Sequence, residues 1–357
     1  MNRLIVLLNI LLFPLSKIWE FAYALRRAFY DYGLLKKEIF QVPVISIGNL
    51  TFGGTGKTPF IIYLSKYFQE IQKVPVILTR GYKGELEDGD GIIFADKKFK
   101  ANPVEYGDEP LLIARRLRKG AVIVGKKRSQ NLKKYFHQVR PDIVLLDDGY
   151  QHIQIFRSFN VALFDATLPI NRYKVAPMGY LREGLSALGD ADAIVISRCD
   201  LASDENIENL ENLIAPYHHH KIPVAKIKYL ATGIFDIYYN KIYEIDELKG
   251  VSVIAAVAIA SPESFFAMLD SFGVNIVHRA IYPDHYYFTK DDVNSLLRTA
   301  AENSAIVITS EKDLVKIRKI TQDVKITFVN IEVDFISGER EFLTQVNKRL
   351  SLESNHS

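Results

Sequence analysis

The chain has 357 residues, of which 48% are hydrophobic and 24% are charged, a composition typical of a globular protein rather than a disordered one. Its formal net charge of +3 is too small to suggest a nucleic-acid partner. The single cysteine, Cys199, excludes an internal disulfide framework and a cysteine-based zinc site, and it favours a reducing compartment. A chain of this length predicts two α/β domains rather than one.

The N-terminal segment is apolar over residues 4–15, interrupted only by Asn9 and Pro14. This run is shorter than the roughly 18–20 apolar residues that a membrane-spanning helix needs. Aromatic and basic residues follow it, among them Trp19 and Arg26, as at a lipid headgroup interface. We therefore predict a helix that lies on a membrane surface within residues 1–35. A buried core helix and a cleaved signal peptide are the alternatives.

A glycine-rich stretch, TFGGTGKT at residues 51–58, lies between a predicted strand at 42–47 and a predicted helix from Pro59. The residues predicted to bind a nucleotide are Thr51, Phe52, Gly53, Gly54, Thr55, Gly56, Lys57 and Thr58. Backbone N–H groups of such a loop surround phosphate oxygens. Lys57 would reach the β- and γ-phosphates of ATP, and the Thr58 hydroxyl would ligate Mg²⁺. The usual pattern has glycine at position 51, and a chance glycine-rich turn is the alternative.

Two pairs of neighbouring acidic residues follow this loop. Asp108 and Glu109 open a predicted helix at 109–118, where Asp108 is expected to cap the helix and is also a candidate general base. Asp147 and Asp148 end an apolar strand predicted at 143–146, and an acid there can hold a metal beside a phosphate loop. Adjacent strand residues point to opposite faces, so the two carboxylates cannot share one role. An acidic turn after a buried strand is the alternative.

Short apolar runs alternate with amphipathic stretches along most of the chain, which predicts an α/β fold. Buried strands are predicted at residues 42–47, 74–78, 121–124, 143–146, 161–164 and 193–196. This alternation indicates a mostly parallel sheet of the phosphate-loop NTPase type with helices on both faces. The predicted division is a membrane-associating helix at 1–35, a phosphate-loop kinase domain at 36–222, a β-hairpin connector at 223–247, a smaller α/β domain at 248–350 and a polar tail at 351–357.

One histidine, His285, stands out in the second predicted domain because it follows Asp284. A lone histidine is more often a structural residue than a catalytic one, and its surroundings in the sequence leave both roles open.

Taken together, the motifs resemble those of one family, the tetraacyldisaccharide 4′-kinases. The matching stretches are residues 47–50, 53–59, 79–82, 107–110, 146–152, 179–183, 283–285 and 309–313. Members of this family transfer the γ-phosphate of ATP to the 4′-hydroxyl of a tetraacylated glucosamine disaccharide 1-phosphate, which forms lipid IV-A. The resemblance implies ATP and Mg²⁺ as cofactors, an acylated lipid as substrate, and a place on the cytoplasmic face of the bacterial inner membrane.

The resemblance also implies roles for single residues. Asp108 matches the acid that activates the sugar hydroxyl, and His285 matches the histidine that supports it. The other residues carried over are Lys57 and Asp148 as catalytic groups, and Thr58, Asp147 and Glu109 as metal-binding groups. Arg128, Asn171 and Arg182 are candidate contacts to the disaccharide or its 1-phosphate.

This chain departs from the family pattern in two places. Residues 258–262 read AIASP where the family has a glycine-containing run, and Ser310 replaces a threonine. Two other classes share the phosphate loop: an ATPase that acts at the membrane without phosphorylating lipid, and a nucleotide-binding switch. Residues 196–200, ISRCD, lack the lysine of a guanine-reading motif, so a GTP switch is disfavoured.

Overall fold

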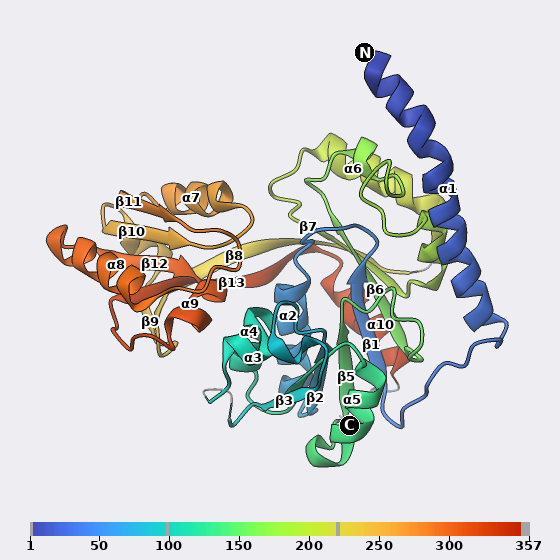
Figure 1. The fold of residues 1–357 in the computed structure, drawn as a ribbon, viewed down its shortest axis with the longest axis horizontal. Helices are drawn as coiled ribbons and strands as arrows, with labels where there is room; N and C mark the ends of the chain where they lie inside the picture. Colours follow the sequence, from blue (N-terminus) through green and yellow to red (C-terminus); the bar gives the residue numbers. More distant parts are fainter. Residues whose placement is uncertain (1–2, 98–99, 219–221, 351–357) are drawn as a thin grey trace.

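The computed structural model describes residues 3–97, 100–218 and 222–350, with side chains from residue 12 onward. The predicted polar tail at 351–357 lies outside these residues. Within them, one sheet of 13 strands runs through the molecule in the order β11-β10-β12-β13-β8-β7-β6-β1-β5-β2-β4-β3, with β9 paired to β8. Two lobes of unequal size are built on this sheet (Figure 1).

The larger lobe is centred on a mostly parallel part of the sheet. Its strands are β1 (Val44–Asn49), β2 (Pro75–Thr79), β3 (Gly91–Phe94), β4 (Ala121–Val124), β5 (Ile143–Asp147), β6 (Phe159–Asp165) and β7 (Ala193–Ser197). Only the β3–β4 pair at the edge is antiparallel. Strands β1, β2, β4 and β5 are buried along their whole length, because helices cover both faces. The predicted α/β class and parallel sheet are thus confirmed.

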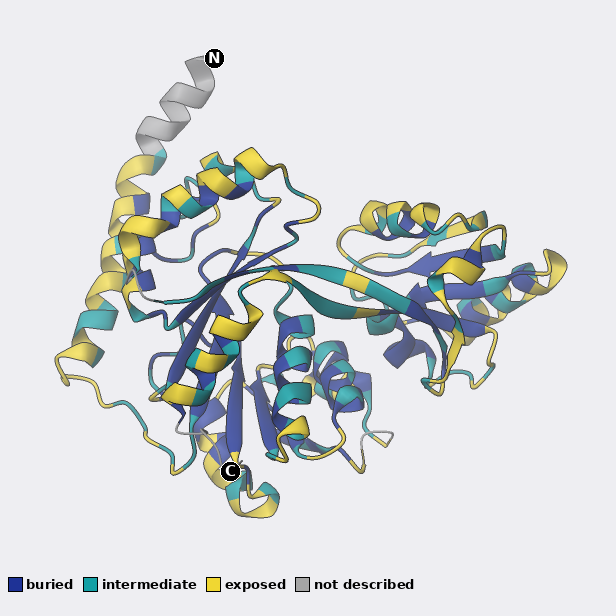
Figure 2. Ribbon diagram, turned by 180° about the vertical axis from the view of Figure 1, so that it is seen from behind, coloured by how far each residue is buried: buried dark blue, intermediate teal, exposed yellow. Residues whose placement is uncertain are grey.

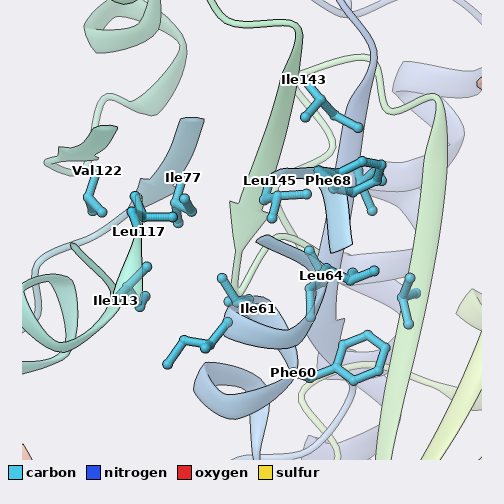
Figure 3. Packing of buried hydrophobic residues seen from close by; sticks show 14 of the residues in the cluster. Phe60, Ile61, Leu64, Phe68, Ile77, Ile113, Leu117, Val122, Ile143 and Leu145 are labelled. Atoms are coloured by element: carbon cyan, nitrogen blue, oxygen red, sulfur yellow. The ribbon is translucent and has the colours of Figure 1, made fainter. Parts of the chain in front are cut away.

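The helices of the larger lobe supply the apolar layers on this sheet. They are α2 (Lys57–Glu70), α3 (Pro103–Tyr106), α4 (Asp108–Arg116), α5 (Arg128–Val139), α6 (Asp204–Ile214) and α10 (Glu339–Arg349). Figure 3 shows Phe60, Leu64 and Phe68 of α2 among the apolar side chains of β5 and its neighbours. This packing fixes the start of α2, and with it the phosphate loop, against the sheet. Helix α2 begins at Lys57, two residues before the predicted start.

The smaller lobe repeats the α/β pattern on the far part of the sheet. Its elements are β9 (Lys241–Tyr243), β10 (Ser252–Val257), β11 (Asn275–Ile281), β12 (Ile306–Ser310), α7 (Pro262–Ser271), α8 (Lys290–Glu302) and α9 (Glu311–Ile317). Apolar side chains of α7 and α8 form separate clusters with the strands between them. The lobe therefore has its own core.

Two long antiparallel strands, β8 (Val224–Asp236) and β13 (Ile326–Ser337), connect the lobes (Figures 1 and 2). The sequence predicted a β-hairpin connector at 223–247, whereas the structure has one strand of 13 residues and a short β9 paired to its end. Strand β13 returns the chain to the larger lobe, where Phe342 of α10 lies 5.6 Å from the Phe60 ring. The last helix thus packs on the larger lobe.

Helix α1 (Arg3–Asp31) runs along one side of the larger lobe (Figure 1). One face of it is fixed by polar contacts: Ser16 Oγ donates to the Val175 carbonyl at 2.8 Å, and Trp19 Nε1 donates to the Arg182 carbonyl at 2.8 Å. Arg27 pairs with Glu183 at 2.7 Å. No helix within the described ranges is both long and apolar enough to cross a membrane.

Candidate active site

The phosphate loop connects β1 to α2 and is shaped by two glycines with left-handed backbone angles. Gly53 has a φ of 100° and Gly56 a φ of 80°, values that side chains other than hydrogen rarely allow. Thr51, which replaces the usual glycine, is buried and forms an isolated bridge with Leu181. The Arg182 guanidinium lies 5.4 Å from the centre of the exposed Phe52 ring. The loop is thus tied on one side to the segment around residues 180–182.

Lys57 connects the ends of two neighbouring strands. Its ammonium donates to Asn49 Oδ1 at 3.0 Å, at the end of β1, and lies 3.3 Å from Asp148 Oδ1, just beyond β5. Thr58 follows in the first turn of α2. The carboxyl ends of these parallel strands meet at one edge of the sheet, so the loop and the acidic pair lie side by side.

The two carboxylates after β5 have different partners. Asp147 is buried and accepts a hydrogen bond from Thr79 Oγ1 at 2.7 Å, and burial raises its pKa. Asp148 has a φ of 46° and pairs with Lys57 and with Arg182 at 2.8 Å. Burial by itself would raise the pKa of Asp148, but Lys57 and Arg182 outweigh it and hold the pKa at about 2. Asp148 therefore stays anionic.

Asp108 and Glu109 stand at the start of α4, across from β5. The predicted cap is wrong: Gly107 is the N-cap, and Asp108 is the first helical residue, with only 4% of its surface exposed. Its Oδ1 accepts from the Glu109 N–H at 2.9 Å. Burial, and repulsion from the Asp147 carboxyl, raise the pKa of Glu109. A bound cation would relieve that repulsion.

His285 of the smaller lobe contacts Asp108 of the larger lobe directly. Its Nδ1 lies 3.0 Å from Asp108 Oδ2, and its Nε2 lies 3.3 Å from the Lys312 ammonium. Because an ammonium can only donate, Nε2 must accept, so Nδ1 carries the proton donated to Asp108. Burial of Asp108 would raise its pKa, but this hydrogen bond and the Lys312 charge lower it.

The loops around His285 fix its position. His285 has a φ of 65°, and its N–H donates to the Ala258 carbonyl at 3.2 Å. The Ala258 N–H donates to the buried Asp313 at 2.9 Å. Ser310 caps α9 by accepting from the Asp313 N–H. The two departures from the family pattern, residues 258–262 and Ser310, thus lie in segments that keep the His285 loop in place.

A bidentate ion pair also joins the lobes near this cluster. Arg116 at the end of α4 donates to Glu311 at the start of α9, from Nε at 2.7 Å and from Nη2 at 2.5 Å. Both side chains are about nine-tenths buried. Such paired contacts hold α4 and α9 in one relative orientation. Asp108 and Lys312 lie on these same two helices.

The predicted substrate contacts divide into two groups. Arg128 is buried at the start of α5 and donates to the Asp148 carbonyl at 3.2 Å, and Arg182 pairs with the Asp148 carboxylate. Both therefore belong to the cluster around the phosphate loop. Asn171 lies on an exposed 3₁₀ turn (Ile170–Arg172) and has none of the contacts that join this cluster.

Sequence reasoning did not assign Lys312, although its motif was noted. Its ammonium lies 3.8 Å from an oxygen of each of three carboxylates, those of Asp108, Glu109 and Asp284. A lysine in the first turn of a helix is unfavourable, because its charge opposes the helix dipole. This placement is the feature of the sequence that could have identified Lys312 as a functional residue. Among the described residues, no group of three or more His, Cys, Asp or Glu side chains is arranged to hold a metal ion.

Comparison with known proteins identifies the family of the chain. A family model described as tetraacyldisaccharide-1-P 4′-kinase matches residues 8–351. The chain belongs to the tetraacyldisaccharide 4′-kinase family. Its relatives include a tetraacyldisaccharide 4′-kinase of Halothermothrix orenii, 31% identical over 95% of this chain and 93% of that protein. Another from Syntrophotalea carbinolica is 33% identical over 92% of this chain and 89% of that protein.

A solved structure of the same family has the same fold. The crystal structure of the "apo" form of LpxK from Aquifex aeolicus in complex with ATP superposes with a TM-score of 0.76 at 27% identity. The alignment covers 95% of this chain and 98% of that chain. The family is thus established over nearly the whole chain.

Proposed function

We propose that this chain transfers the γ-phosphate of ATP to the 4′-hydroxyl of a tetraacylated glucosamine disaccharide 1-phosphate, forming lipid IV-A in lipid A biosynthesis. The observation that carries the proposal is the contact between Asp108 and His285 beside the phosphate loop. It supplies an oriented proton acceptor next to a phosphate-binding loop, the two parts that phosphoryl transfer to an alcohol needs.

The nucleotide would lie on residues Thr51–Thr58, with its phosphates over the start of α2. Lys57 would neutralise charge on the transferring phosphoryl group, and Asp148 would hold Lys57 in place when no nucleotide is bound. Thr58, Asp147 and Glu109 offer hydroxyl and carboxylate oxygens, the donors that Mg²⁺ prefers. Bound there, Mg²⁺ would supply positive charge to the phosphate oxygens.

Asp108 would take the proton from the attacking 4′-hydroxyl. The hydrogen bond that His285 Nδ1–H donates to Asp108 would hold this carboxylate in one orientation for that transfer. Lys312 would keep His285 in the tautomer that donates to Asp108. The meeting of the lobes at this contact would keep water from the phosphoryl group.

The acceptor lipid would approach from the side of Arg182. Arg128 and Arg182 carry positive charge near Asp148, suited to phosphate groups of either substrate. Asn171 is proposed as a contact to the sugar rings, on the loop that packs under α1.

Helix α1 is proposed to lie on the cytoplasmic face of the bacterial inner membrane. Its outward face carries a stripe of exposed apolar side chains at helical spacing, namely Leu15, Ile18, Phe21, Leu25 and Phe29. The opposite face is the one bound to the larger lobe. A helix with one apolar face exposed and the other docked is suited to a membrane surface, where the acyl chains of the substrate lie.

We propose that the predicted domains have different tasks. Residues 36–222 would bind ATP as the kinase domain, and 248–350 would bring His285 and Lys312 to it, with 223–247 as the connector. In this division the connector is the start of the β8–β13 ribbon, and α10 is counted with the second domain although it packs on the larger lobe.

The test measures where the γ-phosphate of ATP is transferred. The protein is incubated with γ-labelled ATP, Mg²⁺ and vesicles that contain the tetraacylated disaccharide 1-phosphate. We expect the label to move to the lipid at the 4′ position. Label released to water at the same rate with and without lipid would identify an ATPase, and bound but unreacted ATP would identify a nucleotide switch. Either result would overturn the proposal.

A further inference from the structure

Tyr229, in the middle of β8, reaches the phosphate loop from the ribbon that connects the lobes. Its hydroxyl oxygen lies 3.3 Å from the Thr55 carbonyl oxygen and 3.2 Å from the Gly56 carbonyl oxygen, and the two carbonyls share its single proton. Ser197 Oγ, at the end of β7, donates to the same Thr55 carbonyl at 3.0 Å. Burial raises the pKa of Tyr229, so the hydroxyl keeps its proton and remains a donor.

These contacts fix the direction of two successive peptide groups. In a trans peptide the C=O and the following N–H point in opposite directions. Holding the Thr55 and Gly56 carbonyls toward β8 therefore directs the N–H groups of Gly56 and Lys57 away from β8; the Gly56 carbonyl also accepts from the Phe60 N–H of α2 at 3.4 Å. Those N–H groups are the donors that a phosphate loop offers to its ligand.

The fit between Tyr229 and the loop is close. A Cβ atom built on Gly56 would lie 1.5 Å from the Tyr229 hydroxyl oxygen, so any other residue at this position would push the tyrosine side chain aside. Gly56 also has the left-handed φ of 80° and caps α2. The tyrosine and the last glycine of the loop thus depend on each other.

We propose that Tyr229 is a positioning residue of the nucleotide site, which holds the last two peptides of the phosphate loop ready for the phosphates. The inference rests on the proposed function, since it assumes that the loop binds ATP. Tyr229 lies opposite Val333 in the β8–β13 pair, and these strands continue into the lobe that carries His285. The same ribbon therefore contacts the phosphate loop and continues into the smaller lobe, which carries His285.

The test measures ATP binding rather than lipid phosphorylation. Titration calorimetry with Mg²⁺ and ATP compares the full-length wild type with Tyr229→Phe, which removes only the hydroxyl. We expect the Kd for ATP to rise about three- to tenfold, the value of one ordinary hydrogen bond. The KM for lipid should stay unchanged, because the acceptor does not touch this part of the loop. Tyr238→Phe is the matched control, since its hydroxyl contacts only Gln322 at the surface.

The outcomes separate this inference from the proposed function. Equal ATP affinity in wild type and Tyr229→Phe would overturn the inference and leave the kinase assignment intact. Absence of ATP binding by the wild type would overturn both. If Tyr229→Phe unfolds, Ser197→Ala tests the same Thr55 peptide, and unchanged ATP affinity in that variant would overturn the inference.

Discussion

Asp147 and Asp148 are adjacent in the sequence, yet their surroundings move the pKa of each carboxyl in opposite directions. Burial raises the pKa of Asp147, whereas Lys57 and Arg182 hold that of Asp148 at about 2. The sequence predicted that the two side chains would differ, because they lie at the end of one strand. It could not predict the partners, because Arg182 comes from a loop 34 positions away that is ordered by its contacts with Phe52 and α1.

The first prediction for a single residue concerns the effect of Lys57 on kcat. Lys57→Met should lower kcat by about a hundred- to a thousandfold, because it removes charge that stabilises the transferring phosphoryl group. The fold should persist, since Asp148 keeps its pairing with Arg182. Lys66→Met, on the same helix, is the control and should retain normal activity, because its partly exposed pair with Glu332 is not part of the proposed nucleotide site. Normal kinase activity in folded Lys57→Met would refute the nucleotide assignment.

Lys312 gives a second prediction. Lys312→Met removes the donor to His285 Nε2, so kcat should fall about ten- to a hundredfold while the KM for ATP stays near its normal value. Nitrogen NMR should show that His285 no longer keeps its proton on Nδ1 alone. Lys312→Arg should recover part of the rate because it restores a donor. Lys319→Met, on an exposed residue two positions beyond α9, serves as the control.

A His285 spectrum unchanged in Lys312→Met would show that Lys312 does not set the tautomer.

Among the elements, the buried parallel strands were predictable and the connecting ribbon was not. Strands β4, β5 and β7 are continuous apolar runs, which identify a strand covered on both faces. Strand β8 is half exposed along most of its length and contains Gly233, so its pattern resembles a loop followed by a hairpin. Its length depends on pairing with β13, about a hundred residues later, which local sequence does not contain.

The proposed role of helix α1 in membrane binding can be tested by substitution. Ile18 and Phe21 are about 65% exposed, so Ile18→Ser with Phe21→Ser should leave the fold unchanged. Binding to anionic vesicles should fall about tenfold or more, because each side chain contributes a kcal/mol or more on entering an apolar phase. Vesicle flotation measures the bound fraction.

The control for this experiment is Val277→Ser with Ile281→Ser, which removes two exposed apolar side chains from β11 in the smaller lobe. That variant should bind vesicles like the wild type. Equal loss in both variants would mean that binding is non-specific and that α1 does not lie on the membrane.

For the whole molecule, the arrangement that matters is the meeting of the two lobes. Asp108 and His285 are 177 positions apart, and they meet because α4 and α9 pack together through Arg116 and Glu311. The sequence placed the two residues in different predicted domains, and it did not show what would bring them together. The structure has the contact already formed, and the ion pair between α4 and α9 accounts for it, because both partners are buried and bidentate. No local pattern in the sequence reports such a pairing.

The most direct test of the account is a double-mutant cycle on Asp108 and His285, measured as kcat for transfer of γ-labelled phosphate to lipid at saturating ATP and lipid. The variants are Asp108→Ala, His285→Ala and their combination. If His285 orients Asp108 so that the two act as one unit, each single substitution lowers kcat steeply, and the double variant is hardly slower than the slower single. Losses that multiply fully would contradict the account, since His285 would then act independently of Asp108.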